Sequence, residues 1–415
     1  MAGGWNGTSN VLTSEISSIG LNGSPEWQLT PGSMSTAHST GAAVVLQNGK
    51  ALVCGGYTGS ANTGVSEIFD TTSGTWSDVG SMLNGRSYHT ATRLQNGKVL
   101  VTGGYNGQSN LNVCEVFDPA TNTWATTADS LDQGRSYHTA TLLKNGKVLI
   151  AGGFNPAFGF QLSSAELYDP ETNRFSPVPS MANSRAWHAA SLLADGRLLV
   201  TGGEHFNGGT PFAYDGMKSA EIYDPVANAW SPAADMPAGL SYNAQFSIAG
   251  NRVLVIGGLK NTNYSPSFSY EQGESYVYQV ETNTWSPFPM NADGRVYFGA
   301  ALVDSNMVVV AGGIGMSEAE YFAVTTSTAV NQFGNLLAFS VSPNPGSAHG
   351  VFRIHTDIEP VTIEITDLSG RTFSPQVSAN GAGYCLKLEG FRAGLYMVLA
   401  KTAEGRLYKT RLILE

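Results

Sequence analysis

A pair of consecutive glycines recurs along the first three quarters of the sequence. The second glycine of each pair stands at intervals of about 50 residues, at Gly4, Gly56, Gly104, Gly153, Gly203, Gly258 and Gly313. A period of this length is typical of repeat architectures, in which one unit cannot bury its apolar face alone and must stack on its neighbours. The repeat constrains the fold of this chain more than any other feature.

Each repeat contains two predicted β-hairpins. Residues 135–153, RSYHTATLLKNGKVLIAGG, alternate as two short strands on either side of Asn145-Gly146. This dipeptide favours a two-residue hairpin turn, because both of its positions then need a positive φ. After the paired glycines and a loop of variable length comes a second strand pair, as in residues 114–124, CEVFDPATNTW. Each repeat is therefore predicted to form a four-stranded sheet.

The composition is typical of a many-stranded protein and argues against some classes of binding partner. Only 13% of the residues are charged and 49 of 415 are glycine, which is typical of a turn-rich all-β chain. A net charge of −10 argues against nucleic acids and anionic membrane surfaces as partners. No apolar run reaches membrane-spanning length, so we expect no transmembrane segment.

The repeat resembles a known family. Paired glycines, a Tyr-Asp pair such as Tyr168-Asp169 and a tryptophan such as Trp124 resemble the kelch repeat at these offsets. The resemblance implies that residues 1–325 form a β-propeller, and the tryptophans are then expected to pack between blades. Residues 3–15 match 103–115, so the first blade is incomplete. Both a six-bladed ring and a truncated seven-bladed one remain open, and residues 319–322 favour seven.

The end of the chain leaves the repeat. We expect a linker at residues 326–337 and a small antiparallel β-sandwich at 338–415, so the predicted fold class is all-β throughout. This part resembles the C-terminal sorting domain of type IX secretion cargo, in the positions Pro343, Asn344, Pro345, Gly370, Gly394, Tyr396 and Lys409. The resemblance implies contact with a secretion machinery and localisation outside the cell or on the outer-membrane surface. The chain opens without a signal-peptide pattern, which we interpret as truncation.

Tyr-His pairs are the strongest candidates for chemistry. Tyr88-His89 and Tyr137-His138 resemble a ligand pair of galactose-oxidase-like copper enzymes, which also use a kelch propeller. However, a catalytic site breaks a repeat, whereas these pairs recur at one repeat position in consecutive blades. We therefore expect no catalytic residue, no metal and no cofactor, and keep a copper radical oxidase as the alternative function.

Other repeated polar residues are also expected to be structural. Cys54 and Cys114 stand where other repeats have small residues, which predicts buried, unreactive thiols. Arginines recur at Arg86, Arg135, Arg185 and Arg295. We favour hydrogen bonds from them to loop carbonyls over an anion site. Acids recur once per blade at Glu67, Glu115, Glu166 and Glu221, unlike the unique carboxylate pair of a glycosidase.

Loop length is what varies between repeats, and variable loops on a rigid scaffold usually carry binding. The long loops of the third, fourth and fifth complete blades are rich in aromatic residues. The candidate ligand-binding residues are Phe154, Phe158, Phe160, His205, Phe206, Phe212, Tyr214, Tyr264, Phe268 and Tyr270. The sequence thus predicts a secreted or cell-surface protein whose propeller presents these side chains to a glycan or protein ligand. A purely architectural interaction scaffold is the third hypothesis, in which the same aromatics only pack the loops.

Overall fold

The structure is a computed structural model. It describes residues 2–5, 10–19, 25–29, 32–206, 213–263, 274–288, 298–304, 307–311, 319–323, 340–342, 351–355, 360–367, 372–373, 376–380, 383–387, 394–402 and 407–414. The chain divides into two compact units. The first consists of residues 1–17 and 27–326, and the second of residues 18–26 and 327–415. The predicted linker at 326–337 lies outside the described residues, and the predicted domain boundaries stay predictions.

Five four-stranded antiparallel sheets, which we call blades A to E, form most of the first unit. Blade A contains β4 (Ala42–Val45), β5 (Ala51–Cys54), β6 (Ser66–Asp70) and β7 (Thr75–Val79). Blade B contains β8 (Thr90–Arg93), β9 (Val99–Thr102), β10 (Glu115–Asp118) and β11 (Thr123–Thr126). Blade C contains β12 (Thr139–Leu142), β13 (Val148–Ala151), β16 (Ala165–Asp169) and β17 (Arg174–Val178). Blade D contains β18 (Ala189–Leu192), β19 (Leu198–Thr201), β22 (Ala220–Asp224) and β23 (Ala229–Ala233). Blade E contains β24 (Ala244–Ile248), β25 (Arg252–Ile256), β27 (Ser275–Gln279) and β28 (Thr284–Phe288).

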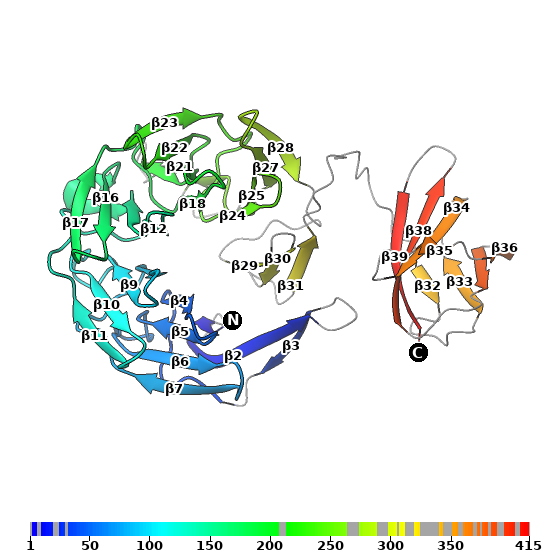
Figure 1. Cartoon of the computed structure of the whole chain (residues 1–415), viewed down its shortest axis with the longest axis horizontal. Coiled ribbons are helices and arrows are strands. Elements are labelled where there is room, and N and C mark those ends of the chain that lie inside the picture. Colours follow the sequence, from blue (N-terminus) through cyan, green and yellow to red (C-terminus); the bar gives the residue numbers. More distant parts are fainter. Residues whose placement is uncertain are drawn as a thin grey trace. The chain divides into compact units, whose positions relative to one another are not determined.

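The blades follow one another in chain order around a common centre (Figure 1). The first strands of consecutive blades, β4, β8, β12, β18 and β24, adjoin one another and line the inside of the arc. The fourth strands lie on the outside. This is the arrangement of a β-propeller, as the repeat predicts.

Two three-stranded sheets stand at the ends of the repeat. One consists of β1 (Ala2–Trp5), β2 (Asn10–Ile19) and β3 (Pro25–Leu29), and the other of β29 (Gly299–Asp304), β30 (Met307–Ala311) and β31 (Ala319–Ala323). β1 pairs antiparallel with β2, with Gly4 opposite Val11 and Trp5 opposite Asn10. In the described residues these two sheets are separate and share no strand.

The first hairpins of blades A to D differ from the predicted turn. In blade C, the N–H of Leu143 donates to the carbonyl of Lys147 at 2.8 Å, and the N–H of Gly146 donates to the carbonyl of Leu143 at 3.0 Å. Of the three loop residues, only Gly146 has a positive φ, of 84°. The connection is therefore a three-residue loop with glycine in the left-handed position, and the predicted two-residue turn was wrong. The Asn145 side chain instead accepts the Lys147 N–H at 3.1 Å.

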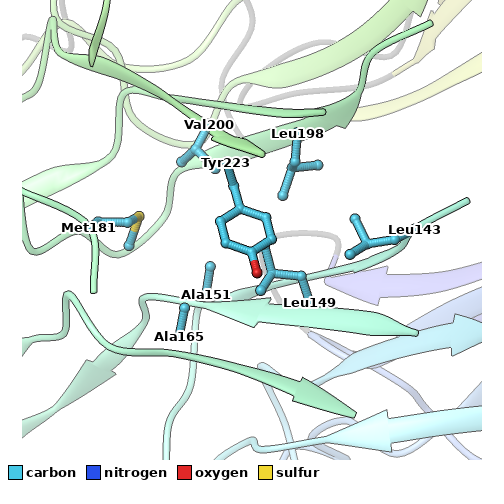
Figure 2. Close-up of a cluster of buried hydrophobic side chains, with 8 residues drawn as sticks. All are labelled: Leu143, Leu149, Ala151, Ala165, Met181, Leu198, Val200 and Tyr223. Atoms are coloured by element: carbon cyan, nitrogen blue, oxygen red, sulfur yellow. The ribbon is translucent and has the colours of Figure 1, made fainter. Parts of the chain in front are cut away.

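The apolar core lies between blades. One buried cluster takes residues from blades C and D and from the connection between them, namely Leu143, Leu149, Ala151, Ala165, Met181, Leu198, Val200 and Tyr223 (Figure 2). The half-buried Trp230 packs against this cluster, with its ring centroid 5.1 Å from that of Tyr223. Its Nε1–H donates to the carbonyl of Pro179, 2.8 Å away. The tryptophan of the repeat thus joins neighbouring blades, as predicted.

The second unit contains two antiparallel four-stranded sheets. One is ordered β32 (Ser340–Ser342), β33 (Val351–His355), β37 (Gly383–Lys387) and β36 (Gln376–Asn380). The other is ordered β35 (Thr372–Phe373), β34 (Pro360–Asp367), β38 (Gly394–Thr402) and β39 (Leu407–Leu414). Ile363 and Ile365 are buried while Glu364 between them is exposed, as expected of a strand with one face on the core.

The predicted sorting-motif residues are placed in part. Gly394 pairs with Leu414 and Tyr396 with Leu412 across β38 and β39, while Lys409 pairs with Leu399. Pro343, Asn344, Pro345 and Gly370 lie outside the described residues. Among the helices of the described residues, none is long and apolar enough to span a membrane.

Candidate ligand-binding face

Buried ion pairs explain the repeated arginines and acids. Arg86, Arg135 and Arg185 are each fully buried, and each donates to the glutamate of its own blade, at distances of 2.7, 3.0 and 2.8 Å to Glu115, Glu166 and Glu221. Nη1 of each guanidinium also donates to two loop carbonyls. In blade B these are the carbonyls of Gly103 and Val113, both at 2.8 Å. The predicted bonds to loop carbonyls are confirmed, but the pairing with the glutamates was not predicted from the sequence.

The same glutamates hold the loop before their blade. The carboxylate of Glu115 accepts the N–H of Leu83 at 2.7 Å, and Glu221 accepts the N–H of Ala182 at 2.7 Å. A charged acceptor strengthens such bonds, and Nη2 of the arginine donates to the other carboxylate oxygen, Oε1. The Arg–Glu pair therefore braces the two loops at one end of blades B, C and D. Arg295 lies outside the described residues.

Histidines of three consecutive blades reach back to the preceding blade. Nε2 of His138 lies 3.0 Å from the hydroxyl of Thr90 and 2.9 Å from that of Thr102. Nε2 of His188 lies 3.0 Å from the hydroxyl of Thr139. These imidazoles are buried contacts between blades, which fits the structural role expected for them.

The protonation of these histidines follows from their surroundings. Burial, reinforced by the positive charge of Arg86, lowers the pKa of His89 to about 3. Burial and the charge of Arg185 likewise lower the pKa of His188 to about 3. Both imidazoles are neutral at physiological pH. Among the described residues, no three His, Cys, Asp or Glu side chains gather as a metal-binding group would require.

The two cysteines of the propeller are buried thiols. Burial raises the pKa of Cys54 and of Cys114 to about 12, so neither is a thiolate at neutral pH. Sγ of Cys54 lies 3.7 Å from Nε2 of His89, at the position where Thr102 contacts His138. These observations agree with the expected small, unreactive side chains.

An aromatic stack crosses four blades on the face that carries the long loops. It consists of the residues that precede the histidine position, Tyr88, Tyr137, Trp187 and Tyr242. Successive ring centroids are 4.3, 4.4 and 5.5 Å apart, with interplanar angles of 34° to 37°. The rings are only partly buried, so their exposed edges form a continuous aromatic strip.

The backbone of the stack is unusual. All four residues have a positive φ, of 55° or 56°, which is uncommon for side chains other than glycine, asparagine and aspartate. The N–H of each residue donates to the carbonyl of the residue one blade earlier, for example Tyr137 to Tyr88 at 3.2 Å and Trp187 to Tyr137 at 3.1 Å. Sequence reasoning treated Tyr88 and Tyr137 only as partners of histidines. The signal for the stack was an aromatic residue at one repeat position in four consecutive blades.

The predicted loop residues of blade C join this stack. Phe154 in β14 (Phe154–Asn155) lies 5.5 Å from the ring of Trp187 and 6.0 Å from that of Phe160 in β15 (Phe160–Gln161). Between them, the 3-10 turn η1 (Pro156–Phe158) is capped by Asn155, whose side chain accepts the N–H of Ala157 at 3.0 Å. Phe158 at the end of this turn is 52% exposed.

The long loops of blades D and E are joined by a sheet of their own. It contains β20 (Glu204–Phe206), β21 (Ala213–Gly216) and β26 (Asn261–Asn263), with Tyr214 opposite Thr262. Since β15 also adjoins β20, the loops of three blades form one continuous sector. Nδ1 of His205 lies 3.2 Å from the hydroxyl of Ser184. Phe206 and Tyr214 are placed by backbone in β20 and β21, whereas Phe212, Tyr264, Phe268 and Tyr270 lie outside the described residues.

Comparison with known families identifies the fold. Residues 1–203 match the KLHDC2/KLHL20/DRC7 Kelch-repeats domain, and residues 188–237 match the Kelch motif. The first unit is thus a kelch β-propeller. Residues 340–415 match the secretion system C-terminal sorting domain. The chain thus contains kelch repeats and carries a sorting domain that implies export to the extracellular space or the outer surface.

Curated relatives share parts of the propeller. The chain is 32% identical to an F-box/kelch-repeat protein of Arabidopsis thaliana over 135 residues, which are 30% of this chain and 27% of that protein. It is 27% identical to Kelch-like protein 25 of Xenopus tropicalis over 152 residues, which are 37% of this chain and 23% of that protein. The chain therefore spans about a quarter of the length of these relatives.

Solved structures share the fold. A fungal alcohol oxidase of the AA5 family in complex with copper is similar at a TM-score of 0.64 and 16% identity, over 100% of this chain and 93% of that one. The structure of YjhT is similar at a TM-score of 0.53 and 15% identity, over 69% of this chain and 96% of that one. At such identities the likeness concerns architecture, because one fold supports many functions.

Proposed function

We propose that this protein is an exported binding protein that engages a glycan or protein ligand with the loop-bearing face of its propeller. The observation that carries the proposal is the continuity of this face. The loops of blades C, D and E adjoin one another through β15, β20, β21 and β26, and Phe154 connects them to the aromatic stack at Trp187. A rigid scaffold that presents adjacent aromatic side chains is a suitable basis for binding, because such rings bury much area at little cost in rotamer entropy.

The charge of the chain limits the kinds of ligand that this face is expected to bind. The chain has a net charge of −10, which disfavours anionic partners such as nucleic acids. The buried arginines are engaged by glutamates and carbonyls, so they are not offered to a ligand anion. The buried arginines thus leave recognition to the other side chains of this face, among which the aromatic residues offer the largest apolar surface.

We further propose that the protein is not an enzyme. A galactose-oxidase-like copper site would use a tyrosine and a histidine of one pair together. Here the two side chains of a pair serve different neighbours: the ring of Tyr137 stacks on Tyr88 and Trp187, while the imidazole of His138 contacts Thr90 and Thr102. Copper analysis of the purified protein, with an assay for oxidation of primary alcohols, tests this point. Stoichiometric copper with turnover would favour the oxidase.

The binding face is tested with Phe158→Ser. Phe158 is exposed and its loss leaves the blade core intact, so we expect an unchanged melting temperature and at least tenfold weaker ligand capture. The purified full chain is screened on a glycan array and against proteins of the outer surface of the producing cell. Val226→Ser, at the exposed turn between β22 and β23, is the matched control, since Val226 is 96% exposed. If Phe158→Ser captures the ligand as well as Val226→Ser does, the binding site lies outside these loops.

A further inference from the structure

The aromatic stack has an open end in blade A. The matching residue there is Thr40, whose φ of 58° continues the backbone conformation of the stack. The N–H of Tyr88 donates to the carbonyl of Thr40 at 3.0 Å, so the backbone ladder also continues. Thr40 supplies no ring, however. Tyr88 is 37% exposed, and among the described residues its ring is stacked only on the Tyr137 side, at 4.3 Å.

A second exposed tyrosine is anchored next to the same place. The N–H of Tyr57 donates to the carbonyl of Ser39 at 2.6 Å, and Tyr57 is 41% exposed. Its hydroxyl donates to the carbonyl of Gly59 at 3.0 Å, which holds the ring across its own loop. The Ser39-Thr40 backbone therefore has an exposed tyrosine hydrogen-bonded to each of its two carbonyls.

Thr40 itself is a strained position. A β-branched residue with positive φ is a conformational outlier. Glycine, which stands at Gly41 next to it, or asparagine would adopt this conformation more readily. The same φ recurs at Tyr88, Tyr137, Trp187 and Tyr242, so blade A keeps the backbone conformation of the repeat although its residue is β-branched.

Three described segments next to the open end are neutral. Segments 32–46, 56–65 and 104–113 contain no Asp, Glu, Lys or Arg, and are rich in Ser, Thr, Asn and Gly. A charged ligand would lose water here without meeting an opposite charge, which is costly. Hydroxyl and amide side chains suit a ligand that carries many neutral hydrogen-bonding groups.

We propose that the open end of the stack binds one neutral pyranose ring of a glycan. The C–H face of the sugar takes the place of the missing layer, against Tyr88 and above Thr40, with its hydroxyl groups toward the Ser, Thr and Asn side chains of blades A and B. Two exposed tyrosines among small polar residues offer area for one ring, whereas a stable protein interface buries about 800 Å² on each partner. This inference rests on the proposed function and specifies its ligand.

The experiment uses the full chain on an array of neutral and sialylated glycans, followed by calorimetric titration with the strongest neutral oligosaccharide. Tyr88→Thr removes the platform but uses the residue that the chain itself places at Thr40, where the backbone conformation is the same. Thr40→Tyr fills the open layer. We expect each variant to weaken binding at least tenfold, and Tyr88→Phe and Val226→Ser to bind within about threefold of the parent chain. Melting curves identify any variant that is unfolded. If Thr40→Tyr fails to fold, the comparison of Tyr88→Phe with Tyr88→Thr alone tests the inference.

Each result supports or overturns the inference. Neutral glycan binding that is lost in Tyr88→Thr and Thr40→Tyr supports it. Preference for sialylated glycans, or neutral binding that survives both variants, overturns it. A short aromatic peptide, acetyl-Tyr-Trp-Tyr-amide, serves as the second probe, and binding of this peptide without any glycan would assign the open end to a protein partner. Capture of a ligand that depends on Phe158 and not on Tyr88 would uphold the proposed function while refuting this inference.

Discussion

Leu240 and Tyr276 lie in one buried apolar cluster of blade E, at the two repeat positions that Arg185 and Glu221 occupy as an ion pair in blade D. The two blades also differ at a third repeat position, which in blade D contacts the ion pair. In blade D, the N–H of Ala182 donates to Glu221, whereas blade E has Pro237 there, which has no N–H to leave unpaired. The chain thus contains both a charged and an apolar version of the same brace.

This relationship predicts a strong coupling between the paired positions. Arg185→Leu alone leaves Glu221 buried without its partner, and we expect the free energy of unfolding to fall by about 3–5 kcal/mol. The triple variant Ala182→Pro, Arg185→Leu, Glu221→Tyr reproduces the brace of blade E and should recover most of that loss. Urea denaturation of the single, double and triple variants measures the coupling. Losses that simply add would show that the three positions act independently.

Replacement of Trp124 tests the packing between blades. Trp124 is half-buried, its ring centroid lies 5.1 Å from that of Phe117, and it packs against the core between blades A and B. Trp124→Ala should lower the free energy of unfolding by about 3 kcal/mol, the lower end of the range for a buried tryptophan because part of the ring is exposed. Trp124→Phe is the milder companion variant. A melting temperature equal to that of the parent chain would disprove a packing role.

The buried histidines predict a loss of stability in acid. His89 and His188 have a pKa of about 3 in the folded protein against an ordinary value of 6.5, so the unfolded chain binds more protons between these values. Their contribution is complete above about pH 6.5 and declines as pH falls toward 3, by up to about 1.4 kcal/mol per pH unit for each histidine. Melting temperatures from pH 8 to pH 4 measure this slope.

The control is His188→Asn, because blade E has Asn243 at this position. The variant loses the contact with Thr139 and should melt earlier at pH 8, yet its melting temperature should depend less on pH below 6.5. An unchanged slope would assign the acid sensitivity to other groups.

Removal of the C-terminal domain should prevent export without preventing the propeller from folding. Removal of residues 340–415, which match the sorting domain, should abolish release or surface display in a host with a type IX secretion system. The shortened chain should keep the far-UV circular dichroism spectrum and the cooperative melt of a propeller, since the blades have their own buried cores. Normal surface display of the shortened chain would contradict the sorting assignment.

The sequence predicted the repeat, the four-stranded blades and the sorting domain, because each depends on local patterns such as paired glycines, alternating strands and turn residues. It did not predict the pairing of Arg135 with Glu166. The two residues are far apart in the repeat, and only the geometry of the blade brings their buried charges together. The turn at Asn145-Gly146 was assigned the wrong length because the same dipeptide also occurs in three-residue loops, where only the glycine needs a positive φ.

The candidate site was predictable only in part. Loop length and aromatic content pointed to Phe154, Phe158 and Phe160, and the structure places Phe154 against Trp187. Stacking between Tyr88 and Tyr137 was not foreseen, because it depends on a positive φ at an aromatic residue, a conformation that propensities disfavour and that the backbone bonds between blades impose.

The ladder of backbone bonds that links Thr40, Tyr88, Tyr137, Trp187 and Tyr242 has a direction. Every N–H in it points to a carbonyl that was synthesised about 50 residues earlier. A chain that emerges from a ribosome or a secretion channel with its N-terminus first therefore presents each acceptor before the matching donor. The direction of the ladder is therefore compatible with assembly of the propeller blade by blade from the N-terminus.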